Sequence, residues 1–161
     1  MIARRRFLIV AASSLSVAGA LALGVLDASP AAAKSPAVYT GIVKGVAVGG
    51  YDPVAYFTAG QPVKGNPAIS LDHDGAKWYF STEANRDAFK AEPAKYAPQY
   101  GGYCAWAVAQ GSTAKGDPTA WSIHEGKLYL NYNQSVRKDW SQNIPANVAK
   151  GDANWPKVIE K

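Results

Sequence analysis

Short apolar runs and helix-like spacings of apolar residues alternate along this chain. The segment 41–57 predicts a short strand, a glycine turn at Gly49-Gly50 and then an extended or turn segment. The polar segment 61–70 predicts a loop, and the compact apolar run 76–82 predicts a buried strand.

A helix is predicted to follow this strand. It begins after Ser81 or Thr82, either of which can cap it, and ends at Pro93. Because Asn85 and Phe89 are four residues apart, they lie on the same face of the helix, and we expect Phe89 to pack inward.

The segment 121–133 predicts a hairpin around the turn Glu125-Gly126. Its apolar residues alternate before and after the turn: Trp121, Ile123, Leu128 and Leu130. The alternation predicts that His124 points away from the face of Trp121 and Ile123.

The last third of the chain predicts helices. Asn133 is a suitable cap, Val136 and Trp140 have helical spacing, and Pro145 interrupts or restarts the helix. The order of strands, helix, strands and helices indicates a small single α+β domain with short antiparallel strands. We find no internal repeat in the sequence.

The N-terminal residues 1–33 have the pattern of a removable targeting segment. Arg4-Arg5-Arg6 precede an apolar run from Phe7 to Leu26, and Ala31-Ala32-Ala33 form a small-residue cleavage site. The arginine pair followed by Phe7-Leu8 also fits a twin-arginine signal. We therefore expect a periplasmic or otherwise exported protein, with a short tether at 34–40 and a domain at 41–161.

The charge of the exported chain excludes one class of partner. Removal of residues 1–33 leaves 14 basic and 11 acidic residues, so the formal net charge falls from +5 to +3. The basic residues are scattered rather than clustered, which argues against nucleic-acid binding. We also expect no stable membrane span after cleavage, and the oligomeric state is left open.

The residues able to supply soft-metal or nucleophilic chemistry in the exported chain are Cys104, His73 and His124. Exported proteins normally pair their cysteines, so the single Cys104 is unusual. One cysteine and two histidines are the composition of a trigonal copper site, or of a zinc site with an open position. Copper and zinc are therefore the candidate metals. The wide spacing of the three residues forms no local motif.

Each of these residues also has a structural interpretation. Cys104 is either a small buried core residue, a metal or haem ligand, or a reactive thiol. The two histidines lie beside turn sequences and are either surface residues or ligands. Asp52 and Asp117 each precede a proline and are interpreted as turn starters.

Three stretches of the chain resemble the YHS domain family: YDPVAYF at 51–57, WYFSTEANRDAF at 78–89 and EPAKY at 92–96. The spacing of their aromatic and proline positions is similar to that of the family over residues 50–96. The segment that follows resembles an exported bacterial subgroup of YHS-domain proteins. The resemblance implies a YHS-like core and a role in metal binding or handling.

The departures from the family pattern concern its metal-associated cysteines, because the corresponding positions here are Ala55, Ser81 and Asn85. These residues are poor ligands for soft ions, so we expect any metal site to have moved. The leading hypothesis is a non-enzymatic protein that handles metal, copper above all, through Cys104 with one or both histidines. The alternatives are a thiol enzyme or redox accessory with Cys104 as nucleophile, and a structural or partner-binding module with an inert cysteine.

Overall fold

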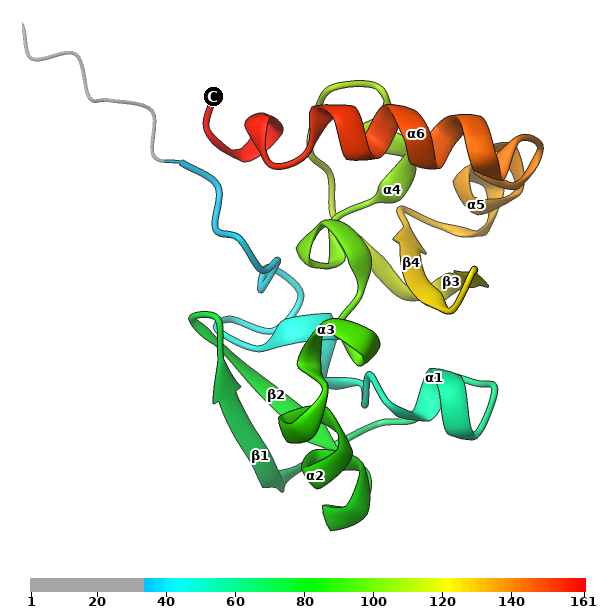
Figure 1. The fold of residues 1–161 in the computed structure, drawn as a ribbon. Helices are drawn as coiled ribbons and strands as arrows, with labels where there is room; N and C mark the ends of the chain where they lie inside the picture. The colour runs from blue at the N-terminus through cyan, green and yellow to red at the C-terminus, as the bar shows by residue number, and fades with distance from the viewer. Residues whose placement is uncertain (1–33) are drawn as a thin grey trace, which may run out of the picture. The chain divides into compact units, whose positions relative to one another are not determined.

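The computed structural model describes residues 34–161, and the expected targeting segment lies outside the described residues. This part of the chain forms two two-stranded antiparallel sheets and several short helices, which confirms the α+β class (Figure 1). The elements in chain order are η1 (Ala47–Gly50), α1 (Ala55–Thr58), β1 (Asn66–His73), β2 (Ala76–Phe80), α2 (Glu83–Ala91), α3 (Pro93–Tyr96), η2 (Gln99–Gly102), α4 (Ala105–Ala109), β3 (Asp117–His124), β4 (Lys127–Asn131), α5 (Gln134–Ser141), α6 (Ile144–Asn154) and η3 (Lys157–Ile159). Within residues 34–161, no helix combines the length and apolar character that a membrane span requires.

The first hairpin pairs β1 with β2 around the turn Asp74-Gly75, whose two residues have φ of 49° and 73°. The buried strand expected at 76–82 is confirmed as β2. The loop expected at 61–70 is wrong from Asn66 onward, because the hairpin pairs Asn66 with Phe80 and continues after a bulge.

The strand expected within 41–57 is also wrong. Val48 and Gly49 have φ of 53° and 59°, which turns the chain into the short helix η1 instead of extending it. Val46 keeps only isolated bridges, to Val43 and Lys77. The apolar residues around Val48 are buried although they form no strand, because they pack into the core with β2.

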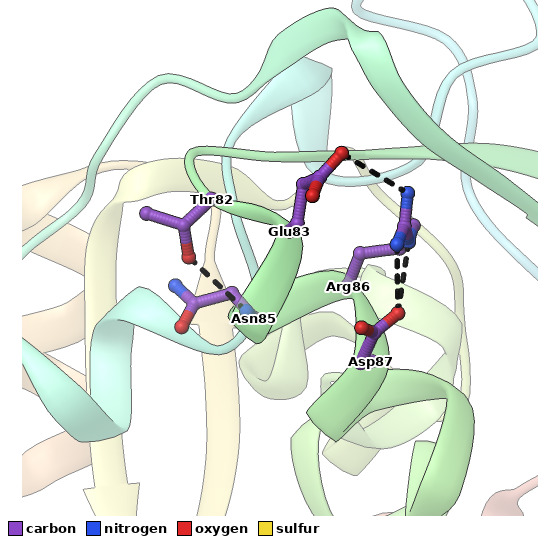
Figure 2. Close-up of polar contacts among 5 residues, drawn as sticks. All are labelled: Thr82, Glu83, Asn85, Arg86 and Asp87. Carbon is purple, nitrogen blue, oxygen red and sulfur yellow. Dashed lines mark hydrogen bonds and ion pairs between the residues drawn. The ribbon is translucent and has the colours of Figure 1, made fainter.

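Helix α2 begins as the sequence predicts. The Thr82 hydroxyl accepts a hydrogen bond from the Asn85 backbone N–H at 3.1 Å, so Thr82 rather than Ser81 is the cap (Figure 2). Arg86 forms exposed ion pairs with Glu83 and Asp87 on the outer face of the helix, as Figure 2 shows. Phe89 of the same helix is completely buried, as expected.

The second hairpin pairs β3 with β4 around Glu125-Gly126, and its turn is confirmed. Ser122 is buried and its hydroxyl accepts a hydrogen bond from Arg137 of α5, whereas Ile123 is exposed. Trp121, on the same face as Ile123, packs edge-on against Tyr56 of α1 with ring centroids 5.3 Å apart. The fully buried face of β3 is therefore the one opposite Trp121 and Ile123.

The helices after this hairpin follow the prediction. The Asn133 side chain accepts a hydrogen bond from the Val136 N–H and caps α5, and Trp140 is fully buried. Pro145 lies in the first turn of α6, where its missing N–H costs no hydrogen bond. The sequence therefore starts a new helix at this proline.

The structure contains an internal repeat that the sequence analysis did not identify. Each half begins with a short helix containing three successive residues of positive φ, Val48-Gly49-Gly50 in the first half and Tyr100-Gly101-Gly102 in the second. An isolated bridge joins Tyr51 to Lys64 in one half and Tyr103 to Lys115 in the other.

The hairpins and the helices that follow them repeat as well. Both hairpins pair an eight-residue strand with a five-residue strand and have one bulge near the start. Helix α2 lies beside the first hairpin, and α5 lies beside the second (Figure 1). Because Gly-Gly-Tyr precedes both Asp52 and Cys104, the single cysteine occupies the position that Asp52 holds in the first half.

The segment expected to be a tether packs against the second half. The Tyr39 N–H donates to the Gly101 carbonyl at 2.9 Å, and the Tyr103 hydroxyl donates to the Pro36 carbonyl at 2.9 Å. Val38 is buried in the core of the first half, together with residues of both hairpins. This segment therefore contacts both halves of the domain.

Candidate functional site

Asp52 is fully buried, and its carboxylate is the centre of a hydrogen-bond network. One oxygen, Oδ1, accepts from the N–H groups of Val54 and Ala55 at 2.9 and 3.3 Å. The other, Oδ2, accepts from the Ser81 N–H at 2.8 Å, the Ser81 hydroxyl at 2.6 Å and the Asn85 side-chain amide at 2.7 Å. The turn expected at Asp52 is present, and the network also ties that turn to β2 and α2.

The network includes the three positions at which the YHS family pattern has cysteines, which here are Ala55, Ser81 and Asn85. All three contact the same carboxylate, so the fold does bring these positions together. Their chemistry does not fit a soft metal ion, because two of them use their hydrogens to satisfy Asp52 and none offers a thiolate. The network instead compensates a buried charge with several donors.

Cys104 immediately precedes α4 and is only 1% exposed. Its thiol lies 3.8 Å from the Asn131 side-chain oxygen, which also accepts the Trp106 N–H at 3.2 Å. Burial raises the pKa of the Cys104 thiol above its ordinary value, because the thiolate would lose its hydration. The side chain is therefore a protonated thiol at neutral pH, which is a weak nucleophile.

His73 ends β1, and its side chain is 33% exposed. Its Nε2 lies 3.3 Å from the Asp74 carboxylate, and its ring packs edge-on against Phe89 with centroids 5.6 Å apart. The Trp78 indole N–H donates to the His73 backbone carbonyl at 3.0 Å. These contacts place His73 beside the first hairpin turn.

His124 ends β3 at the equivalent place in the second hairpin, with its Nε2 3.8 Å from the Glu125 carboxylate. The two histidines therefore belong to separate turns of the repeat, and Cys104 lies in the core. Among residues 34–161, no group of three or more His, Cys, Asp or Glu side chains could hold a metal ion. The structure does not bring His73, His124 and Cys104 together.

Two buried side chains with unsatisfied polar atoms lie in the second half. Asn131 and Trp140 are fully buried, and the Asn131 amide nitrogen and the Trp140 indole nitrogen have no hydrogen-bond partner among the described residues. Their counterparts in the first half, Phe80 and Phe89, pack with ring centroids 5.4 Å apart. In the sequence, this difference between the halves is visible as Asn131, a polar residue that ends an apolar strand before Tyr132.

A cleft of about 260 Å³ lies where the two halves meet. It is lined by Ile42, Gly49, Tyr51, Lys64, Lys115, Asp117, Pro118 and Thr119. The Lys64 ammonium lies 4.1 Å from the centroid of the Tyr51 ring, and the Lys115 ammonium lies 4.9 Å from that of Tyr132. Neither ammonium forms an ion pair within residues 34–161.

Exposed apolar side chains lie close to these lysines. Ile42, which lines the cleft, is 45% exposed, and Tyr132, beside the Lys115 ammonium, is 43% exposed. A second cleft of about 390 Å³ shares Lys115 and extends along Tyr39 and Thr40. Lys115 therefore lies in the lining of both clefts.

Comparison with known proteins identifies part of the chain. Residues 54–100 match the family model described as YHS domain. The match ends at the start of the second half, which is the part that repeats the first. No curated protein and no solved structure matches the chain significantly.

Proposed function

We propose that this YHS-domain protein is an exported, non-catalytic module that binds an acidic segment of a partner protein. The observation that carries the proposal is the cleft at the junction of the halves, whose lining contains Lys64, Lys115 and the exposed Ile42. Unpaired ammonium groups attract carboxylates, and exposed apolar side chains gain free energy when a partner covers them.

The donor groups in the domain favour this function over metal handling. The carboxylate of Asp52 is already satisfied by five donors. Cys104 is buried, and the raised pKa of its thiol disfavours both a thiolate ligand and a nucleophile. Copper binding through Cys104 with His73 or His124 would require these residues to leave their present contacts.

Export is the second part of the proposal, and it rests on the arginines, apolar run and small-residue site of the first 33 residues. Expression of the full chain in a bacterial host, followed by cell fractionation and intact mass measurement, tests it. We expect a periplasmic product that begins near Lys34. A full-length product confined to the cytoplasm would contradict export.

Partner binding is tested by photocrosslinking in the host cell. A photoreactive amino acid, p-benzoylphenylalanine, replaces Ile42 in one variant and the exposed Lys90 of α2 in a control variant. We expect position 42 to form a discrete adduct that position 90 does not form. Mass spectrometry of the adduct should identify a segment rich in Asp and Glu.

Charge reversal tests the role of the lysines. Replacement of Lys64 and Lys115 together by Glu should abolish the adduct at position 42, whereas replacement of Lys90 and Lys150 by Glu should leave it unchanged. No adduct at position 42, an adduct with a second copy of this chain, or an adduct that survives the reversal would each refute the acidic partner.

A further inference from the structure

The second half of the domain contains an unbroken chain of six aromatic rings. In order, the ring centroids are separated by 5.2 Å from Trp140 to Tyr129, 5.9 Å to Tyr100, 5.9 Å to Trp155, 6.0 Å to Tyr103 and 5.2 Å to Tyr39. Every ring belongs to Tyr or Trp, the two side chains that release an electron most readily among the aromatic residues. Rings at these separations are in direct contact.

The chain of rings runs from the core to the surface. Trp140 and Tyr129 are fully buried, and Tyr100 and Tyr103 are nearly so. Trp155 and Tyr39 are partly exposed. An oxidant in solution can therefore reach the last two rings, while the others are shielded from direct attack.

Tyr100 has a proton acceptor that suits oxidation. Its hydroxyl donates a hydrogen bond to the Asp152 carboxylate at 2.8 Å, and Asp152 is itself exposed to solvent. A phenol that loses an electron becomes a strong acid, and a carboxylate within hydrogen-bond reach can take its proton. By contrast, the Tyr103 hydroxyl donates to the Pro36 carbonyl, which is a poor proton acceptor.

A glycine of α6 makes room for the hydrogen bond between Tyr100 and Asp152. Gly151 precedes Asp152 in α6, and a Cβ atom at this position would lie 2.5 Å from the Tyr100 hydroxyl oxygen. Any larger residue would therefore displace the hydroxyl from its place beside Asp152. The glycine keeps the hydroxyl and the carboxylate in contact although it lowers the helix propensity of α6.

The first half shows that the fold does not require these rings for packing. Tyr100 corresponds to Val48 in the repeat, and Trp140 corresponds to Phe89, neither of which oxidises readily. The first core is as well buried with these residues as the second core is with Tyr and Trp. The oxidisable chain is therefore a property of the second half rather than of the fold.

We propose that four of these rings, Tyr39, Tyr103, Trp155 and Tyr100, conduct oxidising equivalents from a one-electron oxidant at the surface to Tyr100. The oxidant, a high-potential metal complex or an oxygen-derived radical, takes one electron from Trp155 or Tyr39 and is reduced by one electron. Tyr100 then transfers one electron to the oxidised ring and reduces it. The phenolic proton of Tyr100 moves to the Asp152 carboxylate, which leaves a neutral tyrosyl radical and a protonated Asp152.

Photochemical oxidation tests this path. Tris(bipyridine)ruthenium(II) is excited by light in the presence of an oxidative quencher. The ruthenium(III) complex that forms then oxidises the purified protein. Electron paramagnetic resonance after rapid freezing measures the tyrosyl radical. We expect Tyr100→Phe to remove most of the radical signal, and Tyr132→Phe, which lies outside the chain of rings, to leave most of it.

Two further variants separate the path from simple surface oxidation. Trp155→Phe should at least halve the radical yield at Tyr100, because it interrupts the contact with Tyr103 and removes an exposed ring. Asp152→Asn should slow radical formation and increase its solvent isotope effect, because the proton then has no carboxylate to accept it. Circular dichroism checks that each variant is folded.

The proposal is overturned if Tyr100→Phe and Tyr132→Phe reduce the radical signal equally. It is also overturned if Asp152→Asn leaves the rate and the isotope effect unchanged. None of these outcomes depends on partner binding at the cleft, so the two proposals can fail separately.

Discussion

Replacement of Asp52 by Asn is the most informative single test of the hydrogen-bond network in the first half. The amide has the size of the carboxylate, so the packing around the side chain is kept. One carboxylate oxygen becomes an NH₂ group, which cannot accept a hydrogen bond. If that group takes the place of Oδ2, it faces the N–H and hydroxyl of Ser81 and the amide of Asn85.

The cost follows from the number of donors left without an acceptor. Hydrogen bonds to a charged group contribute about 1.5–3 kcal/mol each, and a buried donor that loses its acceptor costs about 1–3 kcal/mol. The Ser81 hydroxyl can rotate and accept from the new amide, which recovers part of the loss. We therefore expect Asp52→Asn to lower the free energy of unfolding by about 3–5 kcal/mol, the sum of the losses at the remaining donors.

Urea denaturation followed by tryptophan fluorescence measures this change, and Asp117→Asn is the matched control. Asp117 accepts hydrogen bonds from the Thr119 N–H and hydroxyl through Oδ1 alone, and asparagine keeps such an oxygen. We expect the control to cost less than about 1 kcal/mol. A cost below about 1 kcal/mol for Asp52→Asn would refute the central role of this network.

Three further predictions concern single residues. Cys104 should react with iodoacetamide at neutral pH far more slowly in the native protein than in urea, because it is buried and its pKa is raised; equal rates would refute its burial. Burial also raises the pKa of Tyr56, so above pH 10.0 the unfolded state loses a proton that the folded state keeps, and stability falls by up to about 1.4 kcal/mol per pH unit. Tyr56→Phe should make the fall between pH 10 and 12 shallower, as measured by urea denaturation at each pH, and an unchanged slope would contradict this cause. Gly101→Ala should destabilise more than Gly49→Ala in the same assay, because both residues have positive φ but only at Gly101 would a Cβ meet a backbone carbonyl; an equal or smaller cost would contradict this reading.

Local signals in the sequence were sufficient to predict several elements. Thr82 and Asn133 were recognisable as caps, because a short polar side chain precedes an apolar residue at helical spacing. The turn at Glu125-Gly126 was recognisable from the alternating apolar residues around it. These predictions depend on residues that are close in sequence.

The internal repeat could not be predicted in the same way. The two halves share a minority of residues, among them the paired glycines before Asp52 and Cys104, the turn glycines Gly75 and Gly126, and the pairs Lys64/Lys115 and His73/His124. The core residues differ, as in the replacement of Phe80 by Asn131. The positive φ of Val48 and Tyr100 also gives no signal in the sequence, because such residues rarely adopt it.

The environment of each candidate site residue depends on contacts distant in sequence. Cys104 meets Asn131, which is 27 residues away, and Asp52 meets Ser81 and Asn85, which are 29 and 33 residues away. Composition could identify the thiol and the two imidazoles, but only the fold shows that they lie apart. The burial of the thiol likewise depends on β4 passing beside it.

The proposal that the domain needs no metal at Cys104 is tested most directly by the metal content and copper affinity of the protein. The protein is purified without chelators or affinity tags, beside Cys104→Ser, and each is titrated with Cu(I) against a competing chelator. We expect no stoichiometric copper or zinc in either protein, and equal weak binding of Cu(I). One equivalent of tightly bound metal in the native protein that is lost in Cys104→Ser would contradict the account.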